Sequence, residues 1–193
     1  MKNLFDKVFS ILGLLLTSPL FIIIGVLIKL SGEGPVFFRQ NRIGQYGKLF
    51  TIYKFRTMIV NEAIKSISVK GDERITKVGA VLRKLKLDEL PEMWNILIGD
   101  MSFVGPRPDV PGYADKLTGN DRKILELKPG ITGPATLRYS NEEDLLANVE
   151  NPEKFNDGTL FPDKVRLNLE YYENHTIILD VKIIFRTIFR KNY

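Results

Sequence analysis

The chain has 193 residues and carries 28 lysines and arginines against 23 aspartates and glutamates, which gives a net charge of +5. This length suits one domain with a hydrophobic core of its own. There is no cysteine, and His175 is the only histidine, so disulfides, thiolate nucleophiles, cysteine zinc sites and multi-histidine metal sites are excluded. Any bound metal is expected to be a hard ion held by oxygen ligands.

The first predicted element is an uncharged run of 18 residues from Ile11 to Ile28. It reaches the lower limit for a transmembrane helix and is too long for a typical signal peptide or buried core helix. Ser18 and Pro19 interrupt its middle, where proline removes a helical hydrogen bond. Lysines and arginines flank both sides, so the positive-inside rule is satisfied if both ends face the cytoplasm. These residues leave two forms open, a full span and a re-entrant helix that turns at Ser18-Pro19.

The middle of the chain predicts short strands and helices. A turn leads into a strand at residues 31–38, and residues 42–58 alternate like a hairpin whose turn is bracketed by Gly44 and Gly47. Residues 62–75 are polar and predict a loop, and helices are expected at residues 78–87 and 90–98, the second with Pro91 in its first turn. Residues 99–112 and 128–135 are rich in proline and glycine and predict an ordered loop and a tight turn.

The last element, residues 177–189, has apolar residues at helical spacing, with Lys182, Arg186 and Arg190 recurring every four residues on another side. This pattern indicates a helix lying in a membrane interface, or alternatively one packed on the domain core. The expected fold class is α/β (α+β): a membrane helix at residues 1–30, then one cytoplasmic domain of short strands and amphipathic helices at residues 31–193.

Two adjacent carboxylates, Asp88 and Glu89, stand in the apolar stretch "LKLDELPEMWN". Residues 29–86, which precede them, contain 13 basic residues against four acidic ones, a balance that favours binding to phosphates. Carboxylates coordinate Mg²⁺ together with substrate phosphates, or attack phosphorus as nucleophiles. Lys54, Arg83 and Arg107 are candidates to neutralise the phosphate charge. The alternative is that the pair merely supplies acidic residues to the first turn of a helix.

The segment "KLDELPEMWNILIGDMSFVGPRP" resembles the signature of the bacterial sugar transferases, also called monotopic phosphoglycosyl transferases. The resemblance continues through "TSP", "GPVFFRQNRIG", "YKFRTM", "KVGAVLRK", "KPGITG" and "LDVKIIFRTI". It covers most of the chain, from about Phe5 to Phe189, and the ordered series is far more specific than any one motif.

This resemblance implies transfer of a sugar-1-phosphate from a UDP-sugar to polyprenyl (undecaprenyl) phosphate at the cytoplasmic face of the bacterial inner membrane, with release of UMP. It assigns the nucleophile to Asp88, acid-base work or Mg²⁺ binding to Glu89, and phosphate or nucleotide binding to Lys54, Arg83 and Arg107. Mg²⁺ is the expected cofactor, with Asp88 and Glu89 as its ligands. It also favours the re-entrant helix, broken at Ser18-Pro19.

The expected partners are therefore the UDP-sugar donor, the polyprenyl phosphate acceptor and membrane lipids; no nucleic acid is expected, and assembly into a homo-oligomer stays open. One region departs from the family pattern. Asn168 stands where family members often carry an aspartate, Asp163 is a possible substitute, and the acidic segment before them is longer than usual. The competing functions are a glycosyltransferase that releases UDP and a membrane-tethered adaptor without activity.

Overall fold

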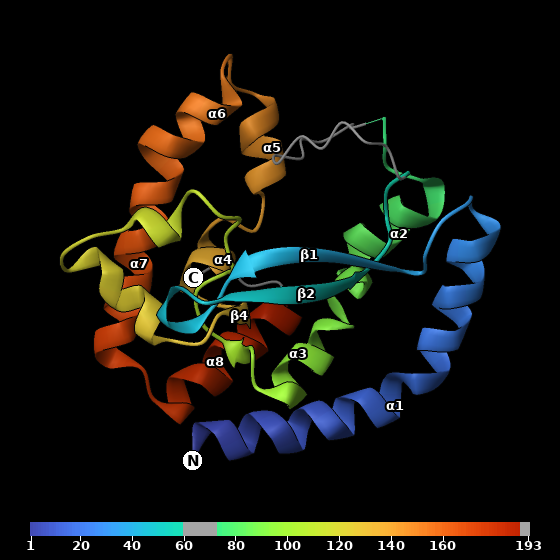
Figure 1. Ribbon diagram of the computed structural model, residues 1–193, viewed down its shortest axis with the longest axis horizontal. Helices are drawn as coiled ribbons and strands as arrows, with labels where there is room; N and C mark the ends of the chain where they lie inside the picture. Colours follow the sequence, from blue (N-terminus) through green and yellow to red (C-terminus); the bar gives the residue numbers. More distant parts are fainter. Residues whose placement is uncertain (60–72, 190–193) are drawn as a thin grey trace.

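The computed structural model describes residues 1–59 and 73–189 (Figure 1). Most of the loop predicted at residues 62–75, and Arg190, lie outside this part. The helices are α1 (Lys2–Leu30), α2 (Lys77–Leu85), α3 (Glu92–Ile98), α4 (Pro134–Arg138), α5 (Glu142–Ala147), α6 (Pro152–Phe155), α7 (Phe161–Asn174) and α8 (Ile177–Ile188). The strands are β1 (Phe37–Ile43), β2 (Leu49–Phe55), β3 (Ser102–Val104) and β4 (Gly130–Thr132). The mixture of helices and strands expected from the sequence is confirmed.

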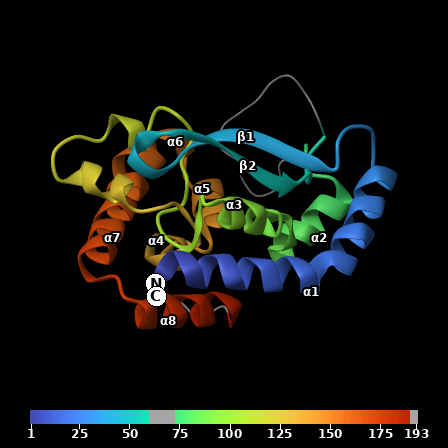
Figure 2. The ribbon, with the colours of Figure 1, turned by 60° about the horizontal axis from the view of Figure 1, so that its bottom comes forward.

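Strands β1 and β2 form the predicted hairpin. They pair antiparallel from Phe37 opposite Phe55 to Ile43 opposite Leu49. The turn between them is a short helical turn, Gln45–Gly47, and Gly47 takes a φ of 76° that suits glycine. The hairpin extends along one side of the molecule (Figure 2).

Strands β3 and β4 form a second, parallel sheet that the sequence did not predict. Ser102 pairs with Gly130, and Val104 pairs with Thr132. Both strands fall in segments expected to be a loop and a tight turn. Each has only three residues and is surrounded by prolines and glycines, so neither shows the alternation by which longer strands are identified.

The two helices predicted around the carboxylate pair are confirmed as α2 and α3. The side chain of Thr76 caps α2 by accepting a hydrogen bond from the Gly79 backbone nitrogen, 2.9 Å away. Lys86 ends α2 in the left-handed conformation, with φ 58°. This reversal turns the chain sharply before α3 begins.

Helix α1 runs without interruption through Pro19, so the predicted break is a bend within a continuous helix. Proline cannot donate to the Leu15 carbonyl, four residues earlier. The Ser18 hydroxyl donates to that same carbonyl over 2.8 Å, which explains how the helix continues past the proline. The axis of α1 changes direction in both ribbon views (Figures 1 and 2). By length and composition, α1 is able to cross a membrane.

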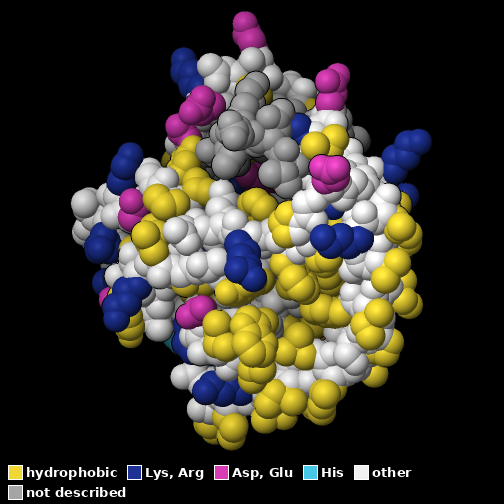
Figure 3. Space-filling model, turned by 45° about the vertical axis from the view of Figure 1, so that its right-hand side comes forward, with side chains coloured by type: hydrophobic (Ala, Val, Ile, Leu, Met, Phe, Trp, Pro, Cys, Tyr) yellow, Lys and Arg dark blue, Asp and Glu magenta, His cyan; other side chains and the backbone are white. Residues whose placement is uncertain are grey.

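Both ends of α1 pack against the rest of the chain. Near its C-terminal end, Ile24 and Ile28 join a core cluster with Phe55 and Leu82. At the other end, Lys2 pairs with Asp180 of α8, and α8 lies beside this part of α1 (Figure 2). The opposite face of α1 exposes large apolar side chains, and hydrophobic groups gather along the lower and right-hand part of Figure 3.

Helix α8 packs on the domain core, as one of the two expectations for the C-terminal helix held, and its place in a membrane interface stays a prediction. Ile183 is buried in a core cluster with Val104, Leu137 and Tyr171. Leu179 and Ile184 are partly buried against the same cluster, whereas Ile177, Ile178, Phe185 and Ile188 are exposed. The helix therefore packs on the domain through one side and keeps an apolar side uncovered.

Candidate active site

Asp88 and Glu89 lie on a single helical turn, Leu87–Glu89, between α2 and α3. The left-handed Lys86 directs this turn back toward the domain, and both carboxylates are buried. Two adjacent buried carboxylates repel each other unless cations compensate them. The structure supplies those cations from distant parts of the sequence.

Glu89 is held by two of the basic residues singled out in the sequence. Its Oε1 accepts a hydrogen bond from Arg107 Nη2 at 2.6 Å and from Lys54 Nζ at 3.1 Å. Burial raises the pKa of Glu89, but Arg107 and Lys54 outweigh this effect and hold it well below its usual range. Glu89 is therefore ionised, and its negative charge is compensated by Lys54 and Arg107.

Glu92 completes this cluster and was not identified from the sequence. It is buried, and its Oε1 lies 3.0 Å from Lys54 Nζ. Burial raises the pKa of Glu92 despite the lysine nearby. The sequence could have identified Glu92 by its spacing, because it follows Glu89 by three residues and so lies on the same side of a helical turn.

Among the described residues, Asp88 and Glu92 each have a buried oxygen without a hydrogen bond, but Glu92 Oε1 lies 3.0 Å from Lys54 Nζ. The open oxygen of Asp88 is Oδ1. Burial, followed by repulsion from Glu89, raises the pKa of Asp88, while Lys54, Lys86 and Arg83 lower it. Arg83 thus lowers the pKa of Asp88, and its role in phosphate or nucleotide binding stays a prediction. A carboxylate with an open oxygen is suited to attack an electrophile or to bind a cation.

Asn95 positions Lys54 relative to Glu92. Its side chain accepts a hydrogen bond from the Tyr53 nitrogen at 3.1 Å and donates to the Thr51 carbonyl at 2.7 Å. These two bonds fasten α3 to the edge of β2, next to Lys54. The fully buried amide is thereby satisfied.

Two glycines position Arg107. Gly105 and Gly130 pack so closely that a Cβ on Gly130 would lie 2.2 Å from the Gly105 nitrogen. The Gly130 nitrogen also donates to the Pro106 carbonyl over 2.8 Å. The glycines of "VGPRP" and "KPGITG" therefore allow the loop after β3 to lie against β4 and present Arg107 to Glu89.

Arg56 is another basic residue that the sequence analysis did not select. It is buried, and its guanidinium donates to the carbonyls of Ile28, Gly32 and Glu33, at the end of α1 and just beyond it. A cation at a helix C-terminus is favourable because the last carbonyls lack helical partners. The motif "YKFRTM" thus serves the carboxylate cluster through Lys54 and the membrane-type helix through Arg56.

The carboxylate pair fits Mg²⁺ in part. The open Oδ1 of Asp88 is the hard oxygen donor that Mg²⁺ prefers. Glu89 Oε1 already faces two cations. No group of three or more carboxylate or histidine side chains within the described ranges is arranged to hold a metal. An ion here would need ligands from a bound phosphate as well.

A cavity of about 60 Å³ lies on the other side of Arg107. Asp109, Asn168 and Lys164 contribute to its wall. Burial raises the pKa of Asp109 to about 6, although Lys164 and Arg42 act against it. Asp163 instead bonds Tyr139 and Arg166 at the surface, so the structure gives no support to its replacing Asn168.

Known proteins are similar to this chain along nearly its whole length. The model of the family "Bacterial sugar transferase" matches residues 1–191. The UDP-glucose:undecaprenyl-phosphate glucose-1-phosphate transferase of Escherichia coli (strain K12) is 38% identical over 200 residues, covering 98% of this chain and 40% of that protein. The UDP-N-acetylgalactosamine-undecaprenyl-phosphate N-acetylgalactosaminephosphotransferase of Aeromonas hydrophila is 37% identical, covering 97% of this chain and 42% of its own length.

A shorter relative matches along nearly its whole length. The exopolysaccharide production protein PSS of Rhizobium leguminosarum bv. phaseoli is 34% identical over 197 residues, which cover 97% of this chain and 93% of that protein. The chain thus spans about two fifths of the first two relatives and nearly all of the third.

Proposed function

The chain belongs to the bacterial sugar transferase family, and from this premise we propose that it transfers a sugar-1-phosphate from a UDP-sugar to polyprenyl (undecaprenyl) phosphate. The products are UMP and a polyprenyl-diphosphate-sugar, as in the first membrane step of a glycoconjugate pathway. Relatives whose names state their donor and acceptor use UDP-sugars and undecaprenyl phosphate.

The observation that carries this proposal is the open oxygen of Asp88. It is buried beside a carboxylate, Glu89, that Lys54 and Arg107 already neutralise. A diphosphate entering this site meets two cations and Asp88 Oδ1, which has no hydrogen bond among the described residues; Glu92 Oε1 also has none but faces Lys54. That combination suits nucleophilic attack on phosphorus, since the cations stabilise the charge that develops there.

The proposed reaction has two displacements. In the first, an Asp88 oxygen forms a bond to the phosphorus that bears the sugar, and the bond to the bridging oxygen breaks, so UMP leaves with the electron pair. In the second, an oxygen of polyprenyl phosphate attacks the same phosphorus and Asp88 is released. Arg107, Lys54 and Arg83 neutralise the phosphates, and Glu89 keeps Arg107 and Lys54 in place.

Mg²⁺ is the proposed cofactor, with Asp88 and Glu89 as its protein ligands and the donor diphosphate supplying further oxygens. When bound, the ion neutralises diphosphate charge and favours departure of UMP. The fit is stronger at Asp88, whose Oδ1 is open, than at Glu89, whose Oε1 faces two cations.

We further propose that α1 enters the cytoplasmic face of the inner membrane, bends at Ser18-Pro19 and leaves by the same face, so that residues 1–30 anchor a cytoplasmic domain of residues 31–193. A spanning helix separates its ends by the bilayer thickness, roughly 30 Å. Here both ends contact one domain, through Lys2 and through Ile28. The exposed apolar sides of α1 and α8 would face lipid.

The decisive experiment incubates the purified protein with UDP-sugars before any lipid acceptor is added. Intact-protein mass spectrometry should reveal a phosphosugar adduct, UMP should appear at the same time, and initial rates should follow ping-pong kinetics. Asp88→Asn should lose adduct and turnover, by roughly 10³-fold or about 4 kcal/mol of barrier. Asp100→Asn, which alters an aspartate outside the carboxylate cluster, is the matched control.

Two outcomes would support the competing functions. Release of UDP in place of UMP would identify a glycosyltransferase that moves the sugar alone. Absence of nucleotide release with every donor, despite binding to membranes, would favour an adaptor. Turnover without any Asp88-dependent adduct would replace the covalent route with direct attack by the lipid phosphate.

A further inference from the structure

The cavity behind Arg107 has a chemistry that the carboxylate cluster does not explain. It is lined mainly by apolar groups, among them Pro106, Leu127 and Phe161. A few polar side chains interrupt this lining, as in most sites that bind small molecules. Arg107 belongs both to this wall and to the ion pair with Glu89, so the cavity adjoins the proposed reaction centre.

Two side-chain oxygens of this lining are buried without a hydrogen bond. Asn168 is 6% exposed, and its Oδ1 has no partner among the described residues; the same is true of Thr136 Oγ1. Buried polar atoms in proteins are nearly always satisfied, by protein, water or ligand. The two atoms belong to different helices, α7 and α4, and both helices contribute to one wall.

Charged groups of both signs also line this cavity. Asp109, Glu142 and Lys164 all line the cavity, and Lys164 Nζ lies 2.6 Å from Glu142 Oε1. A ligand that pairs with all these polar atoms must donate hydrogen bonds to several oxygens and also accept one from a cation. Sugar hydroxyls do both, and the apolar groups suit the C–H surface of a pyranose ring. A uridine nucleotide offers one uracil N–H and two ribose hydroxyls on separate rings, which are fewer donors than the hydroxyls carried by a single hexose ring.

The cavity is large enough for one edge of a ligand to enter it. By the same measure a single water needs roughly 10–15 Å³, so about 60 Å³ admits a few hydroxyl groups. Neither a complete nucleoside nor a complete hexose fits, so the cavity can take only one edge of a ligand.

We propose that this cavity receives one edge of the sugar ring of the UDP-sugar donor, and that Asn168 and Thr136 select among sugars by hydrogen bonding to the hydroxyl or acetamido groups on that edge. This inference rests on the proposed function and deepens it. The diphosphate would then lie on the Arg107 side of the cavity, with the phosphorus that bears the sugar between Arg107 and Asp88.

The test compares four donors that share the nucleotide and differ in the sugar: UDP-glucose, UDP-galactose and their N-acetylated counterparts. For the full-length protein in lipid nanodiscs with polyprenyl phosphate, kcat/KM is measured with each donor, and UMP inhibition is measured in parallel. Asn168→Asp preserves the size of the side chain and replaces its donor group. Asn174→Asp makes the same change on the exposed end of α7 and serves as the matched control.

We expect Asn168→Asp to change the ratio of kcat/KM between the best donor and its epimer by about tenfold, the effect of one hydrogen bond in such a site. UMP inhibition should stay within about twofold of wild type, and Asn174→Asp should preserve the wild-type ratio. Thr136→Val provides a second, independent variant if Asn168→Asp fails to fold.

Equal loss with all four donors, together with weaker UMP inhibition, would overturn the proposal and assign the cavity to the nucleotide. An unchanged donor ratio in both variants would overturn it as well. Failure of the wild-type protein to turn over any UDP-sugar would be a different result, because it would reject the proposed function itself.

Discussion

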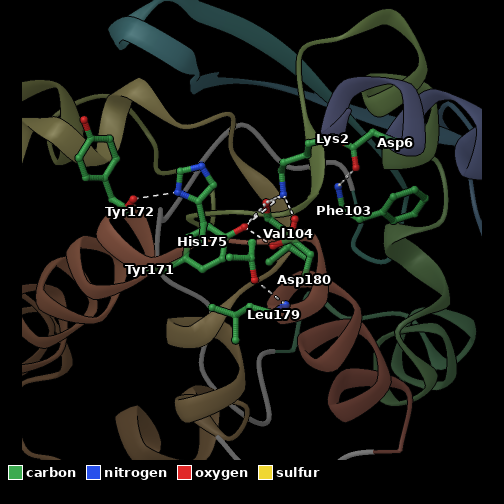
Figure 4. Close-up of polar contacts among 10 residues, drawn as sticks. Lys2, Asp6, Phe103, Val104, Tyr171, Tyr172, His175, Leu179 and Asp180 are labelled. Carbon is green, nitrogen blue, oxygen red and sulfur yellow. Dashed lines mark hydrogen bonds and ion pairs between the residues drawn. The ribbon is translucent and has the colours of Figure 1, made fainter.

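Lys2, in the first turn of α1, donates a hydrogen bond to the carbonyl oxygen of Val104 over 3.0 Å. Val104 is the last residue of β3 and stands three positions before Arg107. The same ammonium pairs with Asp180 and lies 3.1 Å from the Tyr171 hydroxyl (Figure 4). The start of the apolar helix is thereby tied to the strand that leads into the proposed catalytic loop.

Replacing Lys2 by methionine should therefore destabilise the domain. Asp180 is buried and would lose its cation, a change that typically costs about 3 kcal/mol. Denaturation in detergent micelles should show the loss, and turnover should fall as Arg107 becomes less well placed. Lys7→Met, an exposed change on the same helix, should unfold like the wild type. Equal stability of the two variants would contradict the role given to Lys2.

The pH dependence of kcat/KM should report Asp88. Burial and Glu89 raise the pKa of Asp88 above 3.8. The nucleophile must be ionised, so the rate should fall as pH decreases through this raised pKa. Lys86→Gln should move this acid limb to higher pH because Lys86 lowers the pKa of Asp88. If the acid limb of the kcat/KM profile does not move in Lys86→Gln, or moves equally in the control Lys84→Gln, the limb does not arise from Asp88.

Arg56→Leu should lower the free energy of unfolding by about 3 kcal/mol. The substitution leaves three carbonyl groups near the end of α1 without their charged donor, and hydrogen bonds to charged groups are worth roughly 1.5–3 kcal/mol. Chemical denaturation provides the measurement. Arg39→Leu, at an exposed strand position beside Tyr53, is the control, and a similar loss there would argue against a specific anchor.

Cysteine labelling can test the proposed topology, since the chain has no cysteine of its own. Single changes Asn3→Cys and Glu33→Cys should both stay protected from an impermeant reagent in intact spheroplasts and react after lysis. Labelling at position 3 before lysis would indicate a full span. Pro19→Ala restores a helical N–H donor and should shift the helix toward a straight form.

Metal removal should abolish turnover if Asp88 and Glu89 hold Mg²⁺ when the donor is bound. EDTA is expected to stop UMP release, and added Mg²⁺ or Mn²⁺ should restore it. Thermal unfolding should change little, because the ion would depend on substrate oxygens for part of its coordination. Full activity in metal-free buffer would rule the ion out.

Local patterns predicted the parts of the fold that depend on neighbouring residues. The alternation at residues 42–58 predicted the hairpin, and helical spacing predicted α2, α3 and α8, each within a few residues. Strands β3 and β4 escaped because Ser102 and Gly130 meet only in the folded chain. The bend at Pro19 was expected as a break, since the sequence alone does not show that Ser18 bonds the Leu15 carbonyl.

In the candidate site, too, the sequence predicted some residues and missed those whose partners are brought close only by folding. The basic residues named from the sequence, Lys54 and Arg107, do converge on Glu89. Glu92 was missed because a glutamate at the start of a helix usually faces solvent, whereas Lys54 here holds it in the interior. Asn95 and Arg56 act through backbone groups of distant segments, and no sequence pattern identifies such partners in advance.

The packing of both ends of α1 bears on how a soluble version of this enzyme could be obtained. Deleting residues 1–30 would uncover Phe55 and Leu82 and leave Asp180 without Lys2. Arg56 would lose its hydrogen bond to the Ile28 carbonyl. It lies two residues after Lys54, which holds Glu89 and Glu92. A fragment starting at residue 31 should therefore aggregate or bind donor poorly, even though it retains Asp88 and every cation of the site. Mutating the outward apolar side chains of a retained α1 is the better route to solubility.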